Sequence, residues 1–350
     1  MSLTLVTGAT GWLGTQLVQN LVKGFDNIPA LQNPDANRLI RCLRLPADDL
    51  SRLKRISPDI EFRSGDLCAA DAVMSFCRDA AGGTLFHCAG LIHPRRRVRE
   101  LYRVNVTGTL NLLRAAETAG VKRVIVMSSN SPIGTNPSPE HRFDENSPYN
   151  PYMNYGRSKM QMELLLKEFQ QRGKIETVIV RSPWFYGPFQ PVRQSLFFRM
   201  IRDGKVPLVG NGENRRSMAY VENISQGMIL CEKIEAANGQ IFWIADARPY
   251  TMNEIITTIE TLLEKEFSMP VVHKRLKLPY LSGEIATLAD RLIQGLGLYN
   301  QKVHVLSEMN KTIACSIDKA KTILNYDPKI SLEEGMRRSL KWVLDTYGRI

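Results

Sequence analysis

The feature that most constrains this chain is a glycine-rich turn near its start, with the sequence Thr7-Gly8-Ala9-Thr10-Gly11-Trp12-Leu13-Gly14. An apolar run precedes the turn, and the segment after it carries leucine and valine at helical spacing. A strand, a tight turn and a helix in this order bind pyrophosphate, because the helix start offers free N–H groups and a positive dipole. The turn therefore predicts a dinucleotide site formed by Gly8, Thr10, Gly11, Trp12, Leu13 and Gly14.

The rest of the first half alternates strand-like and helix-like segments. We expect strands at 3–7, 39–43, 60–62, 84–88, 123–127 and 176–180, and helices at 12–23, 98–119 and 152–171. Strands that alternate with helices form right-handed crossover units, whose strands pair in parallel. The pattern predicts an α/β fold with a doubly wound parallel sheet of the Rossmann type.

This regularity ends after Val180, where a loop with two prolines and a glycine follows. We therefore expect a dinucleotide-binding domain at 1–182, to which 218–245 returns. The remaining segments, 183–217 and 246–350, are expected to form a smaller, irregular C-terminal lobe that binds the substrate. Within these regions the sequence predicts a returning strand at 241–244, an isolated strand at 271–273 and a terminal helix at 331–347.

The charge balance favours anionic partners, since 46 basic residues against 35 acidic ones give a formal net charge of +11. The densest basic run is Arg95-Arg96-Arg97-Val98-Arg99. We interpret it first as a solvated loop, and second as a contact for the phosphate of a coenzyme A or carrier-protein substrate. Nucleic acid is not an expected partner, because no stacking aromatic residues interleave with the run.

Targeting and metal signals are weak in this sequence. No apolar run reaches the roughly 18 residues that cross a bilayer, so we expect no integral membrane segment. The start of the chain lacks the features of a signal peptide, and the six cysteines are scattered, which favours a cytoplasmic protein. The cysteines and the five histidines show no metal-ligand spacing, so we expect no metal. We interpret His87 as a core or cofactor-pocket residue.

The second and third strands bear on the choice of cofactor. Arg44 follows the second strand, where an NAD site usually has an acidic residue that binds the ribose. A guanidinium suits a 2′-phosphate, so NADP is favoured over NAD. The alternative stays open, because Asp48 or Asp49 can also reach the ribose. After the third strand, Asp66 and the adjacent Leu67 are expected beside the adenine, although Asp66 can also cap the next helix.

A tyrosine and a lysine four residues apart, Tyr155 and Lys159, are the candidate catalytic pair. Positions i and i+4 share one helix face. A cation about 4 Å from a phenol is worth roughly 4 kcal/mol at an effective dielectric near 20, enough to lower the tyrosine pKa from about 10 toward neutrality. Ser129 follows the apolar strand at 123–127 and is placed to donate a hydrogen bond to a substrate oxygen.

Together these motifs resemble the extended short-chain dehydrogenase/reductase family, also called the NAD-dependent epimerase/dehydratase family. The resemblance implies that Tyr155 is the general acid/base, that Lys159 binds the nicotinamide ribose and that Ser129 is the catalytic serine. It implies further roles for Asn105 on the proton-relay side, for Cys88, Ala89 and Gly90 beneath the cofactor, and for Pro183 behind the nicotinamide. It also implies a homodimer.

The residues after Pro183 bear on the substrate. An aromatic series, Trp184, Phe185 and Tyr186, stands where sugar-nucleotide members often have an asparagine, and it favours a ring or acyl chain. Arg216 matches a family arginine that can bind a substrate diphosphate, and Asn130 adjoins Ser129. We interpret the chain as an NAD(P)-dependent oxidoreductase that interconverts a ketone and a secondary alcohol on a mostly apolar small molecule, such as a steroid-like, polyketide-like or acyl substrate.

Within the family, the chain most resembles the branch that contains the 3β-hydroxysteroid dehydrogenases. Two alternatives to this interpretation stay open. One is a nucleotide-sugar epimerase or dehydratase with tightly bound NAD. The other is a non-catalytic redox sensor, which is disfavoured because Tyr155 and Lys159 are both present. The segment 286–293 also has apolar residues at helical spacing, which we interpret as core packing rather than contact with a membrane surface.

Overall fold

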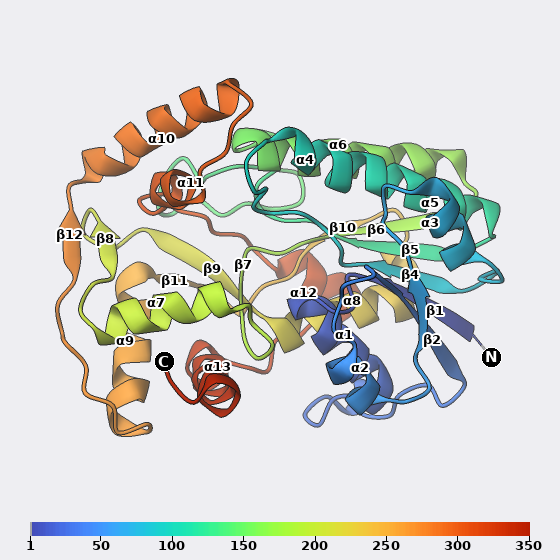
Figure 1. Cartoon of the computed structure of the whole chain (residues 1–350), viewed down its shortest axis with the longest axis horizontal. Coiled ribbons are helices and arrows are strands. Elements are labelled where there is room, and N and C mark those ends of the chain that lie inside the picture. Colours follow the sequence, from blue (N-terminus) through green and yellow to red (C-terminus); the bar gives the residue numbers. More distant parts are fainter. Residues whose placement is uncertain (1) are drawn as a thin grey trace.

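The glycine turn lies at the centre of a seven-stranded parallel sheet (Figure 1). The computed structural model describes residues 2–350. In spatial order the strands are β10 (Ile241–Trp243), β6 (Glu176–Arg181), β5 (Arg123–Met127), β4 (Thr84–His87), β1 (Ser2–Thr7), β2 (Arg38–Arg44) and β3 (Glu61–Ser64). The strand order reverses between β4 and β1, which is where open α/β sheets bind ligands. The doubly wound Rossmann prediction is confirmed, and so is the return of the strand near Ile241.

Helices cover both faces of this sheet, because its central strands are apolar on both sides. One face packs against α1 (Trp12–Lys23), α2 (Ser51–Ile56), α8 (Val221–Lys233) and α12 (Asp318–Leu324). The other face packs against α3 (Ala70–Cys77), α5 (Thr109–Thr118) and α6 (Met153–Arg172). The expected division of the chain assigned α12 to the lobe, yet it packs in the core of the sheet domain.

The second half builds a smaller lobe at the carboxyl ends of the strands (Figure 1). Its two small sheets contain β7 (Trp184–Tyr186), β9 (Arg215–Tyr220) and β11 (Pro249–Thr251), and β8 (Pro207–Val209) with β12 (Leu276–Leu278). Its helices are α7 (Val192–Arg202), α9 (Met252–Lys265), α10 (Tyr280–Gly295), α11 (Gln301–Glu308) and α13 (Leu332–Tyr347). Short 3₁₀ turns lie at Pro29–Leu31 and Glu235–Ala237.

Two local expectations differ from the structure. The isolated strand expected at 271–273 is wrong, because that segment is irregular and the strand of this region is β12. The helix expected at 98–119 is broken into α4 (Arg99–Tyr102), a π-helical segment (Arg103–Gly108) and α5. π-helical segments often mark functional positions, and this one carries Asn105. The terminal helix expected at 331–347 is confirmed as α13.

Candidate active site

The glycine turn has the backbone shape that the sequence predicts. Gly8 has a φ of +70°, and a Cβ there would lie 2.6 Å from the backbone nitrogen of Ala89. A Cβ on Gly14 would lie 2.0 Å from the carbonyl oxygen of Gly8, so only glycine lets α1 pack this closely on the turn. Within the described residues, no side chain caps the start of α1 at Gly11 and no acidic residue lies in its first turn. The turn therefore fits the pyrophosphate of a dinucleotide.

The side chains of the turn divide between the core and the cleft. Leu13 is buried in the core beneath the turn. The ring of Trp12 meets the ring of Phe185 edge-on, with centroids 6.2 Å apart. The indole Nε1 of Trp12 is buried and has no hydrogen-bond partner within residues 2–350. Trp12 therefore links the turn to the strand β7 of the lobe.

Arg44 and Asp48 stand together where β2 ends. The Arg44 guanidinium donates to the carbonyl oxygens of Leu45 (3.4 Å) and Pro46 (3.0 Å). The Asp48 carboxylate accepts hydrogen bonds from Thr10 Oγ1 at 3.0 Å and from the Leu45 nitrogen at 2.9 Å. A cation and an anion thus lie at the same end of the predicted cofactor site. The cation suits the 2′-phosphate of NADP, and the anion suits the ribose hydroxyls of NAD.

Asp66 and Leu67 follow β3, as expected. Asp66 accepts a hydrogen bond from the backbone nitrogen of Cys68 at 2.9 Å, so it shapes the turn before α3. The Leu67 side chain is buried in the core. Its carbonyl oxygen accepts a hydrogen bond from the Asn111 side chain at 3.0 Å. Leu67 can therefore offer only its backbone to an adenine, and the Asp66 carboxylate is engaged in the turn before α3.

Tyr155 and Lys159 lie one helical turn apart near the start of α6, which packs on the loop after β5. A Cβ on Gly156 would lie 2.4 Å from the carbonyl oxygen of Ser131, so the helix meets this loop with no side chain between them. The Lys159 Nζ donates to the carbonyl oxygen of Met127, the last residue of β5, at 2.9 Å. The Ser129 hydroxyl lies close enough to the Tyr155 phenol to lower its pKa. The structure thus brings together the three residues that the sequence selected.

The expected acidity of the phenol is not what the structure shows. Burial raises the pKa of Tyr155 to about 12, although the nearby Ser129 hydroxyl acts in the opposite direction. The expectation of a lowered pKa is wrong here, because the Lys159 ammonium points at the Met127 carbonyl and does not offset burial. Burial lowers the pKa of Lys159 to about 8, while the Glu163 carboxylate opposes that shift.

Asn105 holds the segment that lies beneath the predicted cofactor. Its amide accepts from the Leu91 nitrogen at 2.8 Å, and donates to the Leu91 carbonyl oxygen at 2.9 Å and to Ser158 Oγ at 3.0 Å. A Cβ on Gly90 would lie 3.3 Å from Lys159 Nζ and 3.5 Å from Asn105 Oδ1. Gly90, Asn105 and Lys159 therefore meet at one point below the cleft.

His87, at the end of β4, is a core residue. Its ring nitrogens lie 2.6 Å from Thr7 Oγ1 and 3.0 Å from Thr109 Oγ1. Burial, with a further contribution from Lys159, lowers its pKa to about 3, so the ring is neutral near pH 7. Of the next three residues, Ala89 packs against Gly8, and burial raises the pKa of the Cys88 thiol to about 12. Neither His87 nor Cys88 is activated for chemistry.

A buried ion pair that sequence reasoning missed anchors α6 to the sheet. The Glu163 carboxylate, one turn after Lys159, accepts from Arg181 Nη2 at 2.7 Å, from Ser128 Oγ at 2.6 Å and from the Tyr149 phenol at 2.9 Å. Arg181 ends β6 and Ser128 follows β5, so both strands hold one helix. No sequence motif marks this pair. Its effect is to fix the position of Lys159 and Tyr155.

The expected aromatic wall is only partly present. Trp184 is half-buried and its ring lies 5.4 Å from that of Phe197, while Phe185 meets Trp12. Tyr186 is instead buried in the core of the lobe, where its hydroxyl donates to Asp246 at 2.6 Å. The assignment of Tyr186 to the substrate site is corrected, because its polar end is already satisfied within the core. Pro183 is buried where β6 ends, and Asn130 is half-buried.

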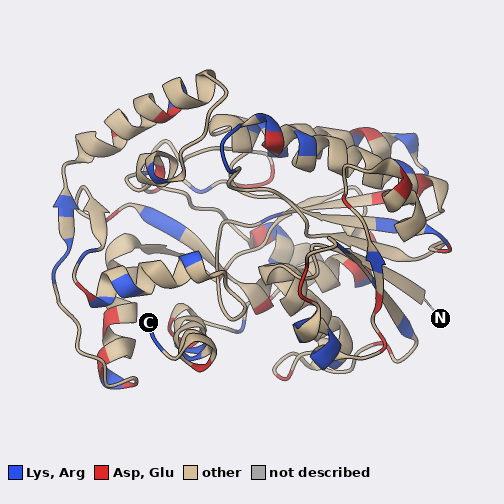
Figure 2. Ribbon diagram, in the orientation of Figure 1, with Lys and Arg blue, Asp and Glu red and all other residues tan. Residues whose placement is uncertain are grey.

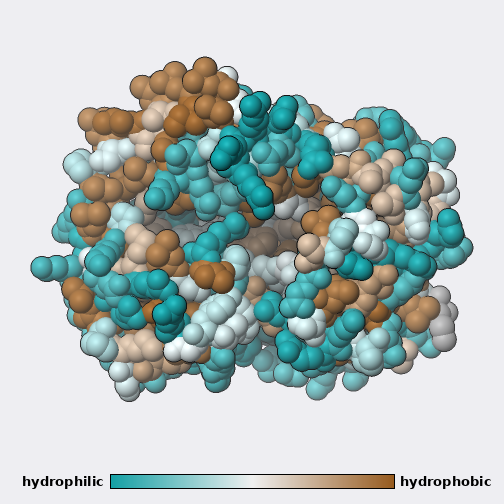
Figure 3. All heavy atoms as spheres, in the orientation of Figure 1, coloured by the Kyte–Doolittle hydropathy of each residue, from teal (hydrophilic) through white to brown (hydrophobic). Residues whose placement is uncertain are grey.

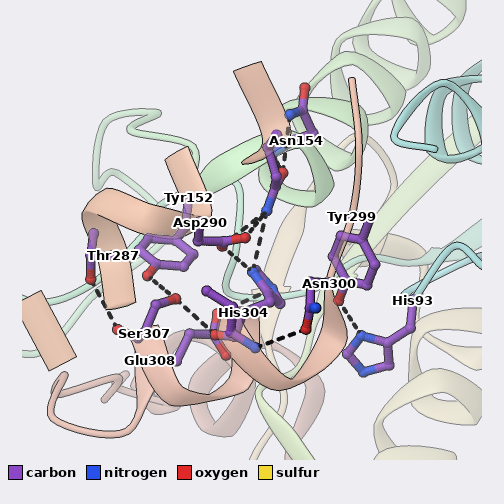
Figure 4. A network of polar contacts seen from close by, with 12 residues as sticks. His93, Tyr152, Asn154, Thr287, Asp290, Tyr299, Asn300, His304, Ser307 and Glu308 are labelled. Atoms are coloured by element: carbon purple, nitrogen blue, oxygen red, sulfur yellow. Dashed lines mark hydrogen bonds and ion pairs between the residues drawn. The ribbon is translucent and has the colours of Figure 1, made fainter. Parts of the chain in front are cut away.

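A buried polar network joins the lobe to the start of α6, and Figure 4 shows it at close range. The Asp290 carboxylate accepts from His304 Nδ1 at 2.7 Å and from the Gln294 amide at 2.9 Å. The Tyr152 hydroxyl bonds Ser307 Oγ at 2.7 Å, and the Tyr299 hydroxyl bonds His93 Nδ1 at 2.6 Å. Burial lowers the pKa of His304, but Asp290 and Glu308 outweigh burial, so the pKa is raised overall.

Two members of this network reach the catalytic pair. Tyr299 belongs to the small apolar cluster that includes Tyr155 and Leu101. The Glu308 carboxylate is close enough to Tyr155 to add to the rise in its pKa. Arg216 is buried and donates to the Glu308 carbonyl oxygen, while its Nε has no partner within the described chain. The surroundings of Tyr155 therefore combine an apolar cluster, to which Tyr299 belongs, with one carboxylate from the lobe, that of Glu308.

The family follows from comparison with known proteins. The model of the NAD dependent epimerase/dehydratase family matches residues 4–245, more than half of the chain. The chain belongs to this family. It is therefore an enzyme of the extended short-chain dehydrogenase/reductase type, for which NAD(P) is the typical cofactor, and the glycine turn of this chain is shaped to hold such a dinucleotide.

Three curated proteins are similar to this chain over different shares of its length. The protein y4nL of Sinorhizobium fredii (strain NBRC 101917 / NGR234) is 48% identical over 97% of this chain and 94% of its own length. The N-acetyl-alpha-D-glucosaminyl-diphospho-ditrans,octacis-undecaprenol 4-epimerase of Escherichia coli O157:H7 is 35% identical over 52% of this chain and 53% of its own. The 3beta-hydroxysteroid-dehydrogenase/decarboxylase isoform 1 of Arabidopsis thaliana is 28% identical over 80% and 66%. The hydroxysteroid branch is thus a distant one.

Proposed function

We propose that this chain moves hydride between a bound nicotinamide cofactor and a secondary alcohol or ketone carbon, with Tyr155 exchanging the proton. The observation that carries the proposal is the meeting of Tyr155 with Ser129, beside Lys159, at the edge of the sheet where β5 ends. This edge adjoins the glycine turn, which fits a dinucleotide. Tyr155 as proton donor and a nicotinamide as hydride carrier, placed next to each other, suit the reduction of a carbonyl and the reverse oxidation of an alcohol.

Each residue of the site has a definite part in this reaction. The nicotinamide, when bound, supplies or accepts the hydride. Burial keeps Tyr155 protonated near neutral pH, so its Oη can give a proton to the substrate oxygen while Ser129 hydrogen-bonds the developing oxyanion. Lys159, held on the Met127 carbonyl one helical turn from Tyr155, would bind the nicotinamide ribose and so place the ring beside the phenol. In oxidation the same phenol oxygen takes the proton back.

The substrate that this site suits best is hydroxylated and anionic, such as a glycosyl diphosphate. Glu308 and Tyr299 face Tyr155, and a carboxylate and a phenol can hydrogen-bond ring hydroxyls. The buried Nε of Arg216 has no partner among residues 2–350, and guanidinium groups bind phosphates well. The Escherichia coli relative is named for a glycosyl diphosphate. The reaction would then be an epimerisation or dehydration, in which one cofactor first takes and then returns the hydride.

The second candidate is reduction of a mostly apolar ketone, steroid-like, polyketide-like or acyl, or oxidation of the corresponding alcohol. The half-buried Trp184 favours it, because its ring and that of Phe197 form an aromatic surface on the lobe. The Arabidopsis thaliana relative is named for a hydroxysteroid. For both candidates we propose Arg44 as the contact for an NADP 2′-phosphate and Asp48 as the competing contact for an NAD ribose. We also propose that the chain forms a homodimer through α6, as the resemblance to the family implies.

One experiment separates the two candidates. The purified protein is denatured with acid, the released nicotinamide is quantified, and untreated protein is incubated with UDP-N-acetylglucosamine or with a ketone panel plus added NADPH. A glycosyl diphosphate substrate predicts retained NAD and sugar epimers or a keto-sugar by NMR, with no added cofactor. Ketone-dependent loss of NADPH absorbance without sugar turnover would favour the second candidate. Equal activity in Tyr155→Phe and the parent protein would reject both.

A further inference from the structure

Helix α10 turns its large apolar residues toward solvent. Their exposed fractions lie between 61 and 78% for Leu281, Ile285, Leu288, Leu292 and, just beyond the helix, Leu296. They follow the helical spacing that sequence reasoning assigned to core packing, so that interpretation is wrong. Figure 3 shows the result as a hydrophobic band over α10. Side chains of this size at i, i+4 and i+7 form one continuous stripe along the helix.

The orientation of α10 is fixed by the opposite face. That face consists of Gly283, Ala286, Thr287, Asp290 and Gln294, all buried. A Cβ on Gly283 would lie 2.5 Å from the Asn310 side chain, and Asp290 is paired with His304. A helix with small and polar residues inward cannot rotate its leucines into the core without breaking these contacts. The exposed stripe is therefore a stable feature of the fold.

The basic run at Arg95–Arg99 is joined to the end of this stripe. The Val98 nitrogen donates to the Gly297 carbonyl oxygen at 3.1 Å, and the Tyr299 nitrogen donates to the Arg96 carbonyl oxygen at 2.9 Å. The four arginines of the run are exposed, and Leu298 beside it is 48% exposed. Figure 2 shows the basic stretch on the loop that leads into α4. Two features that lie far apart in the sequence thus form one surface.

One carboxylate adjoins the arginines of this surface, since Glu100 accepts a hydrogen bond from the Arg97 nitrogen at 3.3 Å, and two others are engaged elsewhere. Asp290 is buried against His304, and Glu284 is paired with Lys311. A groove of about 880 Å³ along α10 adds two further cations, since Arg157 and Arg291 line it with Leu288, beside the paired Glu284 and Lys311. The surface therefore combines an apolar stripe with a positively charged border.

We propose that α10 and the Arg95–Arg99 run form a docking surface for an anionic phospholipid bilayer. Leucine and isoleucine side chains can enter the interface between headgroups and acyl chains, while the arginines meet lipid phosphates. Charge distinguishes this occupant from a second copy of the chain, since a symmetric contact would bring the same arginines against each other. Within residues 2–350, no helix is long and apolar enough to cross a bilayer. The inference does not depend on the identity of the substrate.

Vesicle flotation tests the proposal directly on the full chain. The parent protein at low ionic strength is expected to float with vesicles of equal phosphatidylglycerol and phosphatidylcholine, and much less with phosphatidylcholine alone. The double variant Leu288→Gln/Leu292→Gln should weaken binding about tenfold. The triple variant Arg95→Gln/Arg96→Gln/Arg97→Gln should weaken it about a hundredfold, and added salt should act in the same direction.

A matched control comes from exposed apolar residues elsewhere. Met74→Gln/Leu164→Gln removes two side chains that are 41 and 46% exposed on α3 and α6, and it should bind as the parent does. Circular dichroism and thermal unfolding establish that each variant folds, as expected for exposed positions. The proposal is overturned when the parent protein does not float with the anionic vesicles, or when both α10 and arginine variants float as well as it does. A dimer that the α10 variant dissociates, with no vesicle binding by the parent, would assign the stripe to a second copy instead.

Discussion

The glycine turn and the lobe face of α10 and α11 are built by different kinds of contact. The turn is formed by Gly8, Gly11 and Gly14, which lie within seven residues, and its shape depends on backbone approaches shorter than a side chain allows. The lobe face depends on partners distant in sequence, such as Tyr152 with Ser307 and His93 with Tyr299. The comparison teaches that the spacing of nearby residues determines the shape of the cofactor site. The residues around the substrate are instead brought together by contacts between segments that are far apart in the sequence.

The largest effect on activity is expected at the Tyr155 hydroxyl, which faces both the cofactor side and the lobe. Tyr155→Phe removes the proton that is transferred, so kcat should fall about 100- to 10,000-fold with little change in cofactor affinity. Tyr152→Phe is the matched control, because that hydroxyl bonds Ser307 on the lobe side. It should change kcat only a few-fold. Steady-state kinetics and a cofactor titration on both variants check the prediction, and the reverse order of effects would contradict the assignment.

On the lobe side, the charge of Asp290 should matter most. Asp290→Asn leaves His304 without a buried counter-ion, which is expected to lower the free energy of unfolding by about 3 kcal/mol. Urea denaturation near pH 7 measures the change. Asp318→Asn, at the exposed start of α12, is the control and should stay close to the parent.

The same pair predicts a pH dependence. The pKa of His304 is raised on folding by Asp290 and Glu308, despite burial, so its stabilising contribution is complete below the unfolded pKa of about 6.5. That contribution is lost as the pH rises through the folded pKa. The difference in unfolding free energy between the parent and His304→Gln should therefore shrink above pH 6.5. A difference that is constant or grows with pH would show that the pair is not charged.

On the cofactor side, two glycines give a matched test. Gly14→Ala places a Cβ 2.0 Å from the Gly8 carbonyl oxygen, so the turn must shift and unfolding free energy should fall by about 1–3 kcal/mol, with loss of cofactor affinity. Gly295→Ala, at the end of α10, meets nothing within 4 Å and should be neutral or stabilising by up to about 1 kcal/mol. Thermal unfolding and cofactor fluorescence measure both. Equal losses would mean that the turn is not held as described.

The smallest effect concerns the choice of cofactor. Arg44→Leu removes the guanidinium near the end of β2, and the preference for NADP over NAD should fall about tenfold, or about 1.4 kcal/mol. Asp48→Asn should change the preference in the opposite direction. Dissociation constants for both nucleotides measure it. A parent protein that already prefers NAD, with no change in Arg44→Leu, would assign the ribose contact to Asp48.

Sequence reasoning predicted the parts that short spacing determines. The glycine turn, the central strands and the shared helix turn of Tyr155 and Lys159 require only period and spacing. It did not predict the Glu163 and Arg181 pair or the approach of Glu308 to Tyr155, because those contacts join separate elements. The acidity of Tyr155 was misjudged for a related reason, since burial depends on everything that surrounds the phenol. Helix α10 was misjudged because helical spacing gives a stripe but not the side of the helix that the fold covers.

The most direct test of the central claim is a crystal structure of the full chain with NAD(P)H. The account predicts the pyrophosphate on the backbone of Gly11 and the start of α1, with the nicotinamide ring between Pro183 and the Tyr155 hydroxyl. A coenzyme bound elsewhere, or a nicotinamide ring turned away from Tyr155, would contradict it.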